Sequence, residues 1–163
     1  DGTEEFNYFL SVLFPDDQLM IMDYNRVVRD LNGLTTEDFL KKTEEIFHVS
    51  VLGENAQSPQ HKGQFTMYLE GQWYLLEASE AMLTESDAVK SLDVSLLQEY
   101  LLEPARGLEE LENRTQTDMK VAFAMYPTSI AELFAVADAG LLMPPKSTWF
   151  EPKLRSGLFI HEI

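Results

Sequence analysis

The residues best suited to chemistry lie between Met143 and Gly157, in the sequence MPPKSTWFEPKLRSG. This segment holds three basic residues, Lys146, Lys153 and Arg155, against a single carboxylate. Because the whole chain carries a formal net charge of −16, the segment is a local excess of positive charge on an acidic protein. Lysine offers a point charge and arginine a planar set of donors, and both bind phosphate and carboxylate groups. The segment therefore predicts an anion-binding loop.

Other residues of this loop support either a binding role or a structural one. The hydroxyl groups of Ser147 and Thr148 would add hydrogen-bond donors to an anion site. Three prolines keep much of the loop extended. In the structural alternative, the basic side chains pair with surface carboxylates, and Trp149 and Phe150 anchor the loop to the core.

Arg26 is a second candidate for the site. It lies in the segment 19–28, LMIMDYNRVV, which has the composition of a β-strand. A long cation within a strand needs a partner or a cleft, so Arg26 is expected to join the anion site if the loop forms one. The alternative is a salt bridge to Asp23, Asp30 or a neighbouring strand, which would contribute little at the surface.

A third candidate is the helix that follows Ser129. Ser129 and Glu132 have the spacing of a capping box. A helix N-terminus attracts anions through its free N–H groups and its dipole. The alternative is that Ser129 only caps its own helix.

Three familiar catalytic motifs are missing from the sequence. A phosphate-binding P-loop ends in Gly-Lys-Ser/Thr and holds phosphate with backbone N–H groups. Here Pro145, which has no backbone N–H, stands before Lys146 in place of that glycine. The histidines at positions 48, 61 and 161 lack the spacing of a metal site, and there is no cysteine. No Gly-x-Ser-x-Gly sequence is present. We therefore expect no metal, and the sequence identifies neither a cofactor nor a catalytic residue.

The order of strand and helix patterns predicts the fold class. Strands are predicted at 6–14, 19–28, 48–52, 64–69, 72–77, 121–126 and 158–163, and helices from about residues 35, 93, 107 and 129. The first strand is expected to be buried and paired with the second, and Gly71 to form a hairpin turn. Because there is no regular βαβ alternation, we expect one α+β domain over 1–163, with a mostly antiparallel sheet and about four helices packed mainly on one face.

Charge and composition limit the partners. The chain has 28 acidic and 12 basic residues, which argues against nucleic acid and against anionic membrane surfaces. No window is long and apolar enough for a transmembrane helix. The absence of cysteine fits a cytoplasmic protein.

Eight blocks of sequence, in order, resemble the C-terminal half of the domain-of-unknown-function 1015 family of bacteria and archaea. They are YFLSVLFPDDQL, DYNRVVRDLNGL, MYLEGQWYLL, SLDVSLLQEYLLEP, RGLEEL, VAFAMYPTSI, AELFAVADAG and MPPKSTWFEPKLRSGLF. This resemblance covers nearly the whole chain. Family members carry more residues between the fourth and fifth blocks, so we expect a segment to be missing from the numbering near 104–107.

The resemblance also implies a context. The N-terminal part of this family is similar to ParB-like proteins, some of which bind nucleotides and one branch of which is a free-serine kinase. The chain would then be a C-terminal module that binds a phosphate- or carboxylate-bearing small molecule or a nucleotide, and its partner would be its own missing N-terminal region. The alternative is a non-catalytic scaffold or oligomerisation domain that packs against that region or forms a homodimer.

Overall fold

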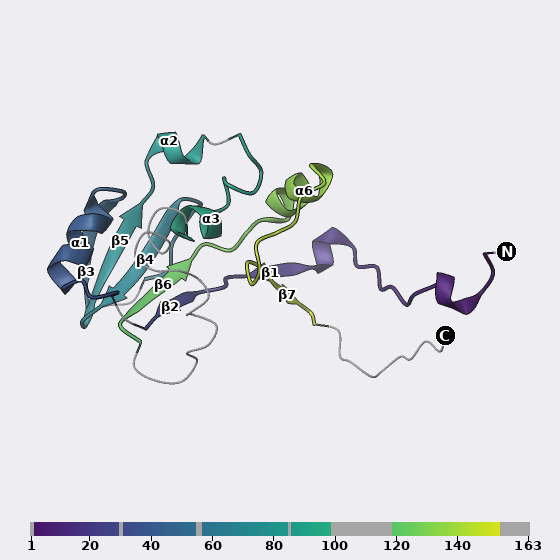
Figure 1. Cartoon of the computed structure of the whole chain (residues 1–163), viewed down its shortest axis with the longest axis horizontal. Coiled ribbons are helices and arrows are strands. Elements are labelled where there is room, and N and C mark those ends of the chain that lie inside the picture. The colour runs from purple at the N-terminus through teal and green to yellow at the C-terminus, as the bar shows by residue number, and fades with distance from the viewer. Residues whose placement is uncertain (1, 30, 55–56, 85, 99–118, 154–163) are drawn as a thin grey trace.

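The computed structural model describes residues 2–29, 31–54, 57–84, 86–98 and 119–153 (Figure 1). Its strands are β1 (Met20–Met22), β2 (Arg26–Val28), β3 (His48–Gly53), β4 (Gln64–Leu69), β5 (Gln72–Glu77), β6 (Val121–Met125) and β7 (Trp149–Glu151). Its helices are α1 (Thr36–Glu44), α2 (Glu80–Leu83), α3 (Asp93–Leu97) and α6 (Ile130–Asp138), with single 3-10 turns η1 (Glu5–Asn7) and η2 (Asp16–Gln18). The predicted α+β class is confirmed. The predictions for 104–107, for a helix over 107–116 and for a strand at 158–163 fall outside the described residues.

The strand pairs of the described residues are all antiparallel and form two sheets. Five strands form the main sheet in the order β2-β6-β4-β5-β3, and β1 pairs with β7 in a separate ribbon. The predicted hairpin is confirmed as β4 and β5. Its turn consists of Glu70 and Gly71, whose φ angles of 47° and 83° are those of a tight two-residue hairpin turn.

One face of the main sheet carries the hydrophobic core. Alternate side chains of β4 and β6 point to this face and are almost fully buried: Phe65, Met67, Leu69, Val121, Phe123 and Met125. Helices α1, α3 and α6 add Phe39, Leu97 and Val136 to the same cluster. These helices therefore cover this face, as the sequence predicts.

The prediction for the N-terminal region is wrong in the described residues. Residues 6–14 form no strand and are exposed, and Figure 1 shows them running away from the main sheet. The predicted strand 19–28 is instead two strands in different sheets, because β1 pairs with β7 and β2 with β6. In the described residues, neither β1 nor β2 pairs with residues 6–14, although the sequence suggests such a pair.

The buried face of α6 (Ile130–Asp138) also differs from what its sequence suggests. Helical spacing predicts a buried face that includes Phe134 and Ala137, yet Phe134 is half exposed and Ala137 is exposed, while Val136 is buried. Successive helical residues are rotated by about 100°, so burial of Val136 turns Phe134 toward the opposite side. The helix meets the core along a narrower stripe than its apolar content suggests.

The polar side chain of Asp93 just before an apolar helical pattern predicts a helix cap, but Asp93 is the first residue of α3. Leu92 occupies the N-cap position without a side-chain bond. The Asp93 carboxylate instead accepts the Gly63 N–H, at 2.9 and 3.0 Å from its two oxygens. The side chain is only 8% exposed. Burial raises the pKa of Asp93 to about 6, although the Gly63 N–H and nearby Lys62 oppose this shift. Because Asp93 and Gly63 are thirty positions apart, no local sequence pattern predicts this hydrogen bond.

Replacing Asp93 with asparagine is expected to change how stability depends on pH. Between pH 6 and 4 the folded protein protonates Asp93 and the unfolded chain does not, so wild-type stability gains from this group as the pH falls. The full gain is about 3 kcal/mol, since each pKa unit corresponds to about 1.4 kcal/mol. The difference in unfolding free energy, Asp93→Asn minus wild type, should therefore be largest at pH 7 and shrink toward pH 4.

Urea denaturation at a series of pH values would measure this difference. Asp138→Asn, at an exposed position of α6, is the matched control and should leave the pH dependence unchanged. A difference that does not vary between pH 7 and pH 4 for Asp93→Asn would show that the buried carboxylate does not titrate in this range.

Candidate functional site

The pairing of β1 with β7 brings the predicted anion-binding loop to the region of Arg26. β7 lies inside that loop, and its Trp149 is opposite Met22 in the ribbon. Tyr24 lies in the short link between β1 and β2, and its ring is 6.1 Å from the Trp149 ring, centroid to centroid. Two segments from opposite ends of the described chain thus form one aromatic pair.

A cation lies over each of these two rings. The Cζ atom of Arg26 is 5.2 Å from the centroid of the Tyr24 ring, and the Nζ atom of Lys153 is 3.9 Å from the centroid of the Trp149 ring. Both distances are within the range of a cation–π interaction. We call Arg26, Tyr24, Trp149 and Lys153 the cation–aromatic row. It links two of the residues that the sequence predicts for the site.

Arg26 is half-buried at the edge of the main sheet. It pairs with Phe123, so its side chain leaves the sheet on the face that carries the core. Burial lowers the pKa of the Arg26 guanidinium, but arginine still keeps its charge at neutral pH. In the described part of the chain, Arg26 has no carboxylate within salt-bridge distance; Asp30, one of the partners considered above, lies outside it.

The remaining predicted residues either make no hydrogen bond or ion pair with the row or lie outside the described chain. Ser147 is buried, and its hydroxyl donates a 2.6 Å hydrogen bond to the carbonyl of Pro144. Lys146 is exposed with a positive φ of 53°, and Thr148 is half-buried. Within residues 119–153, none of the three makes a hydrogen bond or ion pair with a member of the row. Arg155 is not among the described residues.

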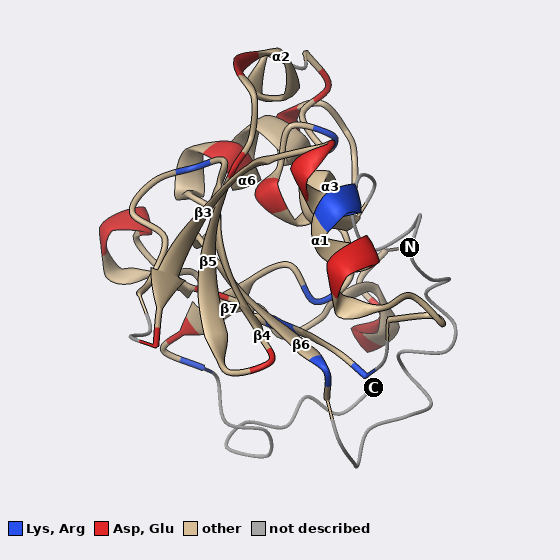
Figure 2. Ribbon diagram, turned by 90° about the vertical axis from the view of Figure 1, so that its left-hand side faces the viewer, with Lys and Arg blue, Asp and Glu red and all other residues tan. Residues whose placement is uncertain are grey.

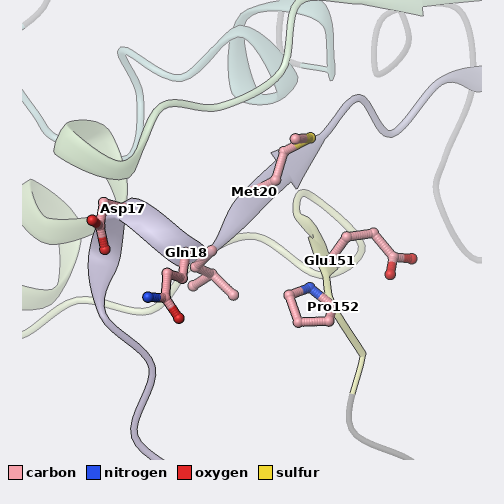
Figure 3. A pocket seen from close by; sticks show the side chains of 6 residues that line it. Asp17, Gln18, Met20, Glu151 and Pro152 are labelled. Carbon is pink, nitrogen blue, oxygen red and sulfur yellow. The ribbon is translucent and has the colours of Figure 1, made fainter.

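A surface depression lies beside the loop, but its lining is acidic. Its walls are Asp17, Gln18, Leu19, Met20, Glu151 and Pro152. Figure 3 shows Asp17 and Gln18 on one side and Glu151 and Pro152 on the other. Two carboxylates without a lining cation repel an anion. Any anion site of this region therefore belongs to the row rather than to the depression.

The N-terminus of α6 is closed by its own side chains. Ser129 Oγ accepts the Glu132 N–H at 3.2 Å, and Glu132 Oε2 accepts the Ser129 N–H at 2.9 Å. The other oxygen of Glu132 is 2.6 Å from Lys62 Nζ. Burial raises the pKa of Glu132, but the bonds from Lys62 and Ser129 outweigh it and the net pKa is lowered. The capping alternative is therefore correct, because a carboxylate already occupies the place of an anion.

The acidic side chains do not gather into a further site. Figure 2 shows Asp and Glu spread over helices and turns, with basic positions scattered among them. A search of the described residues finds no group of three or more His, Asp or Glu side chains that would hold a metal ion. In the same residues, no helix has the length and apolar content needed to cross a bilayer.

The sequence analysis gave no role to Tyr24 and treated Trp149 only as an anchor. The one available signal was that each aromatic residue lies a few positions from a candidate cation: Tyr24 before Arg26, and Trp149 before Lys153. That proximity did not show that the two pairs would meet. Their meeting depends on the β1–β7 pairing, which local patterns do not report.

Comparison with known proteins gives a family. Neither the curated proteins nor the solved structures contain a significant match. A family model described as "Protein of unknown function (DUF1015)" matches residues 1–95, which is more than half of the chain. The match is to the N-terminal part of the chain, so it supports the expected family but neither the near-complete coverage nor the expected correspondence to a C-terminal half. The chain belongs to this family of proteins of unknown function.

Proposed function

We propose that the chain is an anion-binding module in which Arg26 and Lys153 of the cation–aromatic row supply the positive charge. The supporting observation is that both cations lie over aromatic rings, and in the described residues neither has a carboxylate partner. An aromatic ring holds a cation without neutralising it. The field of the two charges therefore remains available to attract an anion, which is unusual on a chain of net charge −16.

The chemistry of the row favours a phosphate- or carboxylate-bearing small molecule, including a nucleotide. A guanidinium stacked on a ring keeps its in-plane N–H groups free, and these match the two oxygens of such a group. Lys153 adds a mobile point charge at the other end of the row. Lys146, Ser147, Thr148 and Arg155 stay predicted contributors from the same loop, but Ser147 could donate to an anion only by giving up the hydrogen bond from its hydroxyl to the Pro144 carbonyl.

The wider context of this proposal comes from the resemblance of the sequence blocks. If the chain corresponds to the C-terminal half of its family, the row would contribute to the active site of a larger, cytoplasmic protein related to ParB and to serine kinases. The missing N-terminal region would then supply the catalytic groups. A non-catalytic interaction domain is the second candidate function, and the exposed apolar residues 6–14 favour it.

Removing either cation of the row should weaken anion binding. We expect Arg26→Ala and Lys153→Ala each to lower the affinity for pyrophosphate about tenfold or more, because a hydrogen bond to a charged group contributes roughly 1.5–3 kcal/mol. Isothermal titration calorimetry with inorganic phosphate, pyrophosphate and ADP would measure this. Lys42→Ala, which removes an exposed lysine of α1, is the matched control and should bind as the wild type does. Equal losses in all three variants, or a wild-type chain that binds none of the probes, would contradict the proposal.

Removing the ring under Lys153 should also weaken binding, although the charge does not change. Trp149→Leu is expected to reduce pyrophosphate affinity several-fold, since a cation–π contact of about 0.5–1 kcal/mol no longer holds the ammonium in place. Trp149→Phe keeps an aromatic face and should retain most of the affinity. The same titrations compare the two variants. If Trp149→Leu binds like the wild type, the ring has no part in positioning Lys153.

A further inference from the structure

Residues 6–14, FNYFLSVLF, form an exposed segment that we call the apolar arm. Seven of its nine side chains are large and apolar, and all seven are exposed: Phe6, Tyr8, Phe9, Leu10, Val12, Leu13 and Phe14. Phe9 is 84% and Leu13 91% exposed. The arm has no charged residue, and Figure 1 shows it extending beyond the β1–β7 ribbon, away from the main sheet. Its surface is thus unlike the rest of this acidic chain.

The arm has the sequence pattern of a half-buried strand. Residues 6, 8, 10, 12 and 14 are all apolar, whereas the intervening positions include Asn7 and Ser11. Such alternation places one fully apolar face along an extended segment. Phe6 and Asn7 belong to the 3-10 turn η1, and the backbone becomes extended at Tyr8, with φ −115° and ψ 154°. Among the described residues, however, no strand pairs with the arm.

The exposed area of the arm is large enough for a stable interface. From the exposed fractions, the seven apolar side chains present on the order of 800 Å² of accessible surface, of which roughly 500 Å² belongs to the face of residues 6, 8, 10, 12 and 14. Stable protein–protein interfaces bury about 800 Å² per partner. Monomeric proteins rarely expose a continuous apolar patch of this size. Burial of the arm against another chain would explain why so much apolar surface is exposed in a single copy.

The β1–β7 ribbon offers a matching surface. Met20 and Met22 point to one face of it and are 61% and 40% exposed, while Ile21 points to the other face and is buried. Within the described residues one edge of β1 is free, because β7 is its only partner there. A two-stranded ribbon is marginal on its own, and a third strand would stabilise it.

The arm of one molecule does not reach this edge in its own chain. Pro15 and the 3-10 turn η2 stand between the arm and β1, and they direct the arm away from the ribbon. Every copy of the chain carries both the arm and the ribbon, so two copies can exchange arms reciprocally and close a two-fold pair. An uncharged contact also suits two molecules that each carry a net charge of −16.

We propose that the chain forms a homodimer in which the apolar arm of each copy adds as a strand to the free edge of β1 in the other. Residues 6, 8, 10, 12 and 14 pack on the face that exposes Met20 and Met22. The main sheet keeps its own contacts. Trp149 and Glu151 are the cross-strand partners of Met22 and Met20 and lie on the same face of the ribbon, so the arm packs beside the Trp149 ring of the cation–aromatic row.

Sedimentation velocity and light scattering over a range of concentrations would test the pairing. The wild-type chain should have twice the monomer mass at high concentration and dissociate on dilution. Leu10→Asp, on the apolar face of the arm, should be monomeric at concentrations where the wild type is a dimer. Ser11→Asp is the matched control, since it adds the same charge one position away on the other face, and it should remain dimeric.

A second pair of variants tests the receiving surface. Met20→Asp should give a monomer, whereas Val51→Asp, on the exposed side of strand β3 in the main sheet, should not. Circular dichroism confirms that each variant is folded. A wild-type chain that is monomeric at every concentration overturns the proposal, as does an equal effect of Leu10→Asp and Ser11→Asp. Open-ended association in place of a closed pair also overturns it.

Discussion

The antiparallel pairing of β1 with β7 is the contact on which the candidate site depends. It involves only three residue pairs, yet it places Trp149 opposite Met22 and thereby against Tyr24. Without it, Lys153 and Arg26 would belong to unrelated parts of the surface. The burial of Ile21 on one face of the ribbon is the main apolar term that fixes the register, because a shift by one residue would turn that side chain to solvent.

The choice of an aromatic ring rather than a carboxylate as the partner of a cation has a functional consequence. An exposed cation–π contact and an exposed salt bridge contribute similar free energies, roughly 0.5–1 and 0–1 kcal/mol respectively. Stability therefore hardly distinguishes the two on this chain, although carboxylates are abundant. Ligand binding does distinguish them, because a carboxylate cancels the charge and also takes up the hydrogen-bond donors. The row retains both the charge and the donors.

Local sequence patterns predicted most helices and strands correctly. The predictions failed where an element depends on pairing with a strand that is distant in the sequence. The helix beginning after Thr35, the hairpin around Gly71 and the capping box at Ser129 were all identified, because each depends on residues within a few positions of one another. The buried strand at 6–14 was wrong for the opposite reason. Its alternation is real, but alternation specifies only that a strand needs a partner and not which strand provides it.

The same distinction applies to the candidate site. The sequence predicted Lys153 from the local excess of basic residues and Arg26 as a cation within a strand. The same excess also predicted Lys146, which lies at an exposed turn and makes no hydrogen bond or ion pair with the row in the described residues. Composition cannot separate these lysines, since each has an aromatic or proline neighbour in the same loop. What separates them is that Lys153 follows β7, so its position is set by strand pairing.

Two candidate anion-binding sites, the cation–aromatic row and the N-terminus of α6, differ in whether a carboxylate already bonds to the positive groups. Both present positive charge, but the helix terminus is already filled by the Glu132 carboxylate, which Ser129 and Lys62 hold in place. An incoming anion would have to displace a charge-assisted hydrogen bond and leave Lys62 without its partner, which costs more than a new contact returns. At the row, the carboxylate of Glu151 accepts the Trp149 indole N–H at 2.7 Å but forms no ion pair with Arg26 or Lys153 in the described residues. An anion at the row would therefore break no salt bridge, although it would meet the charge of Glu151.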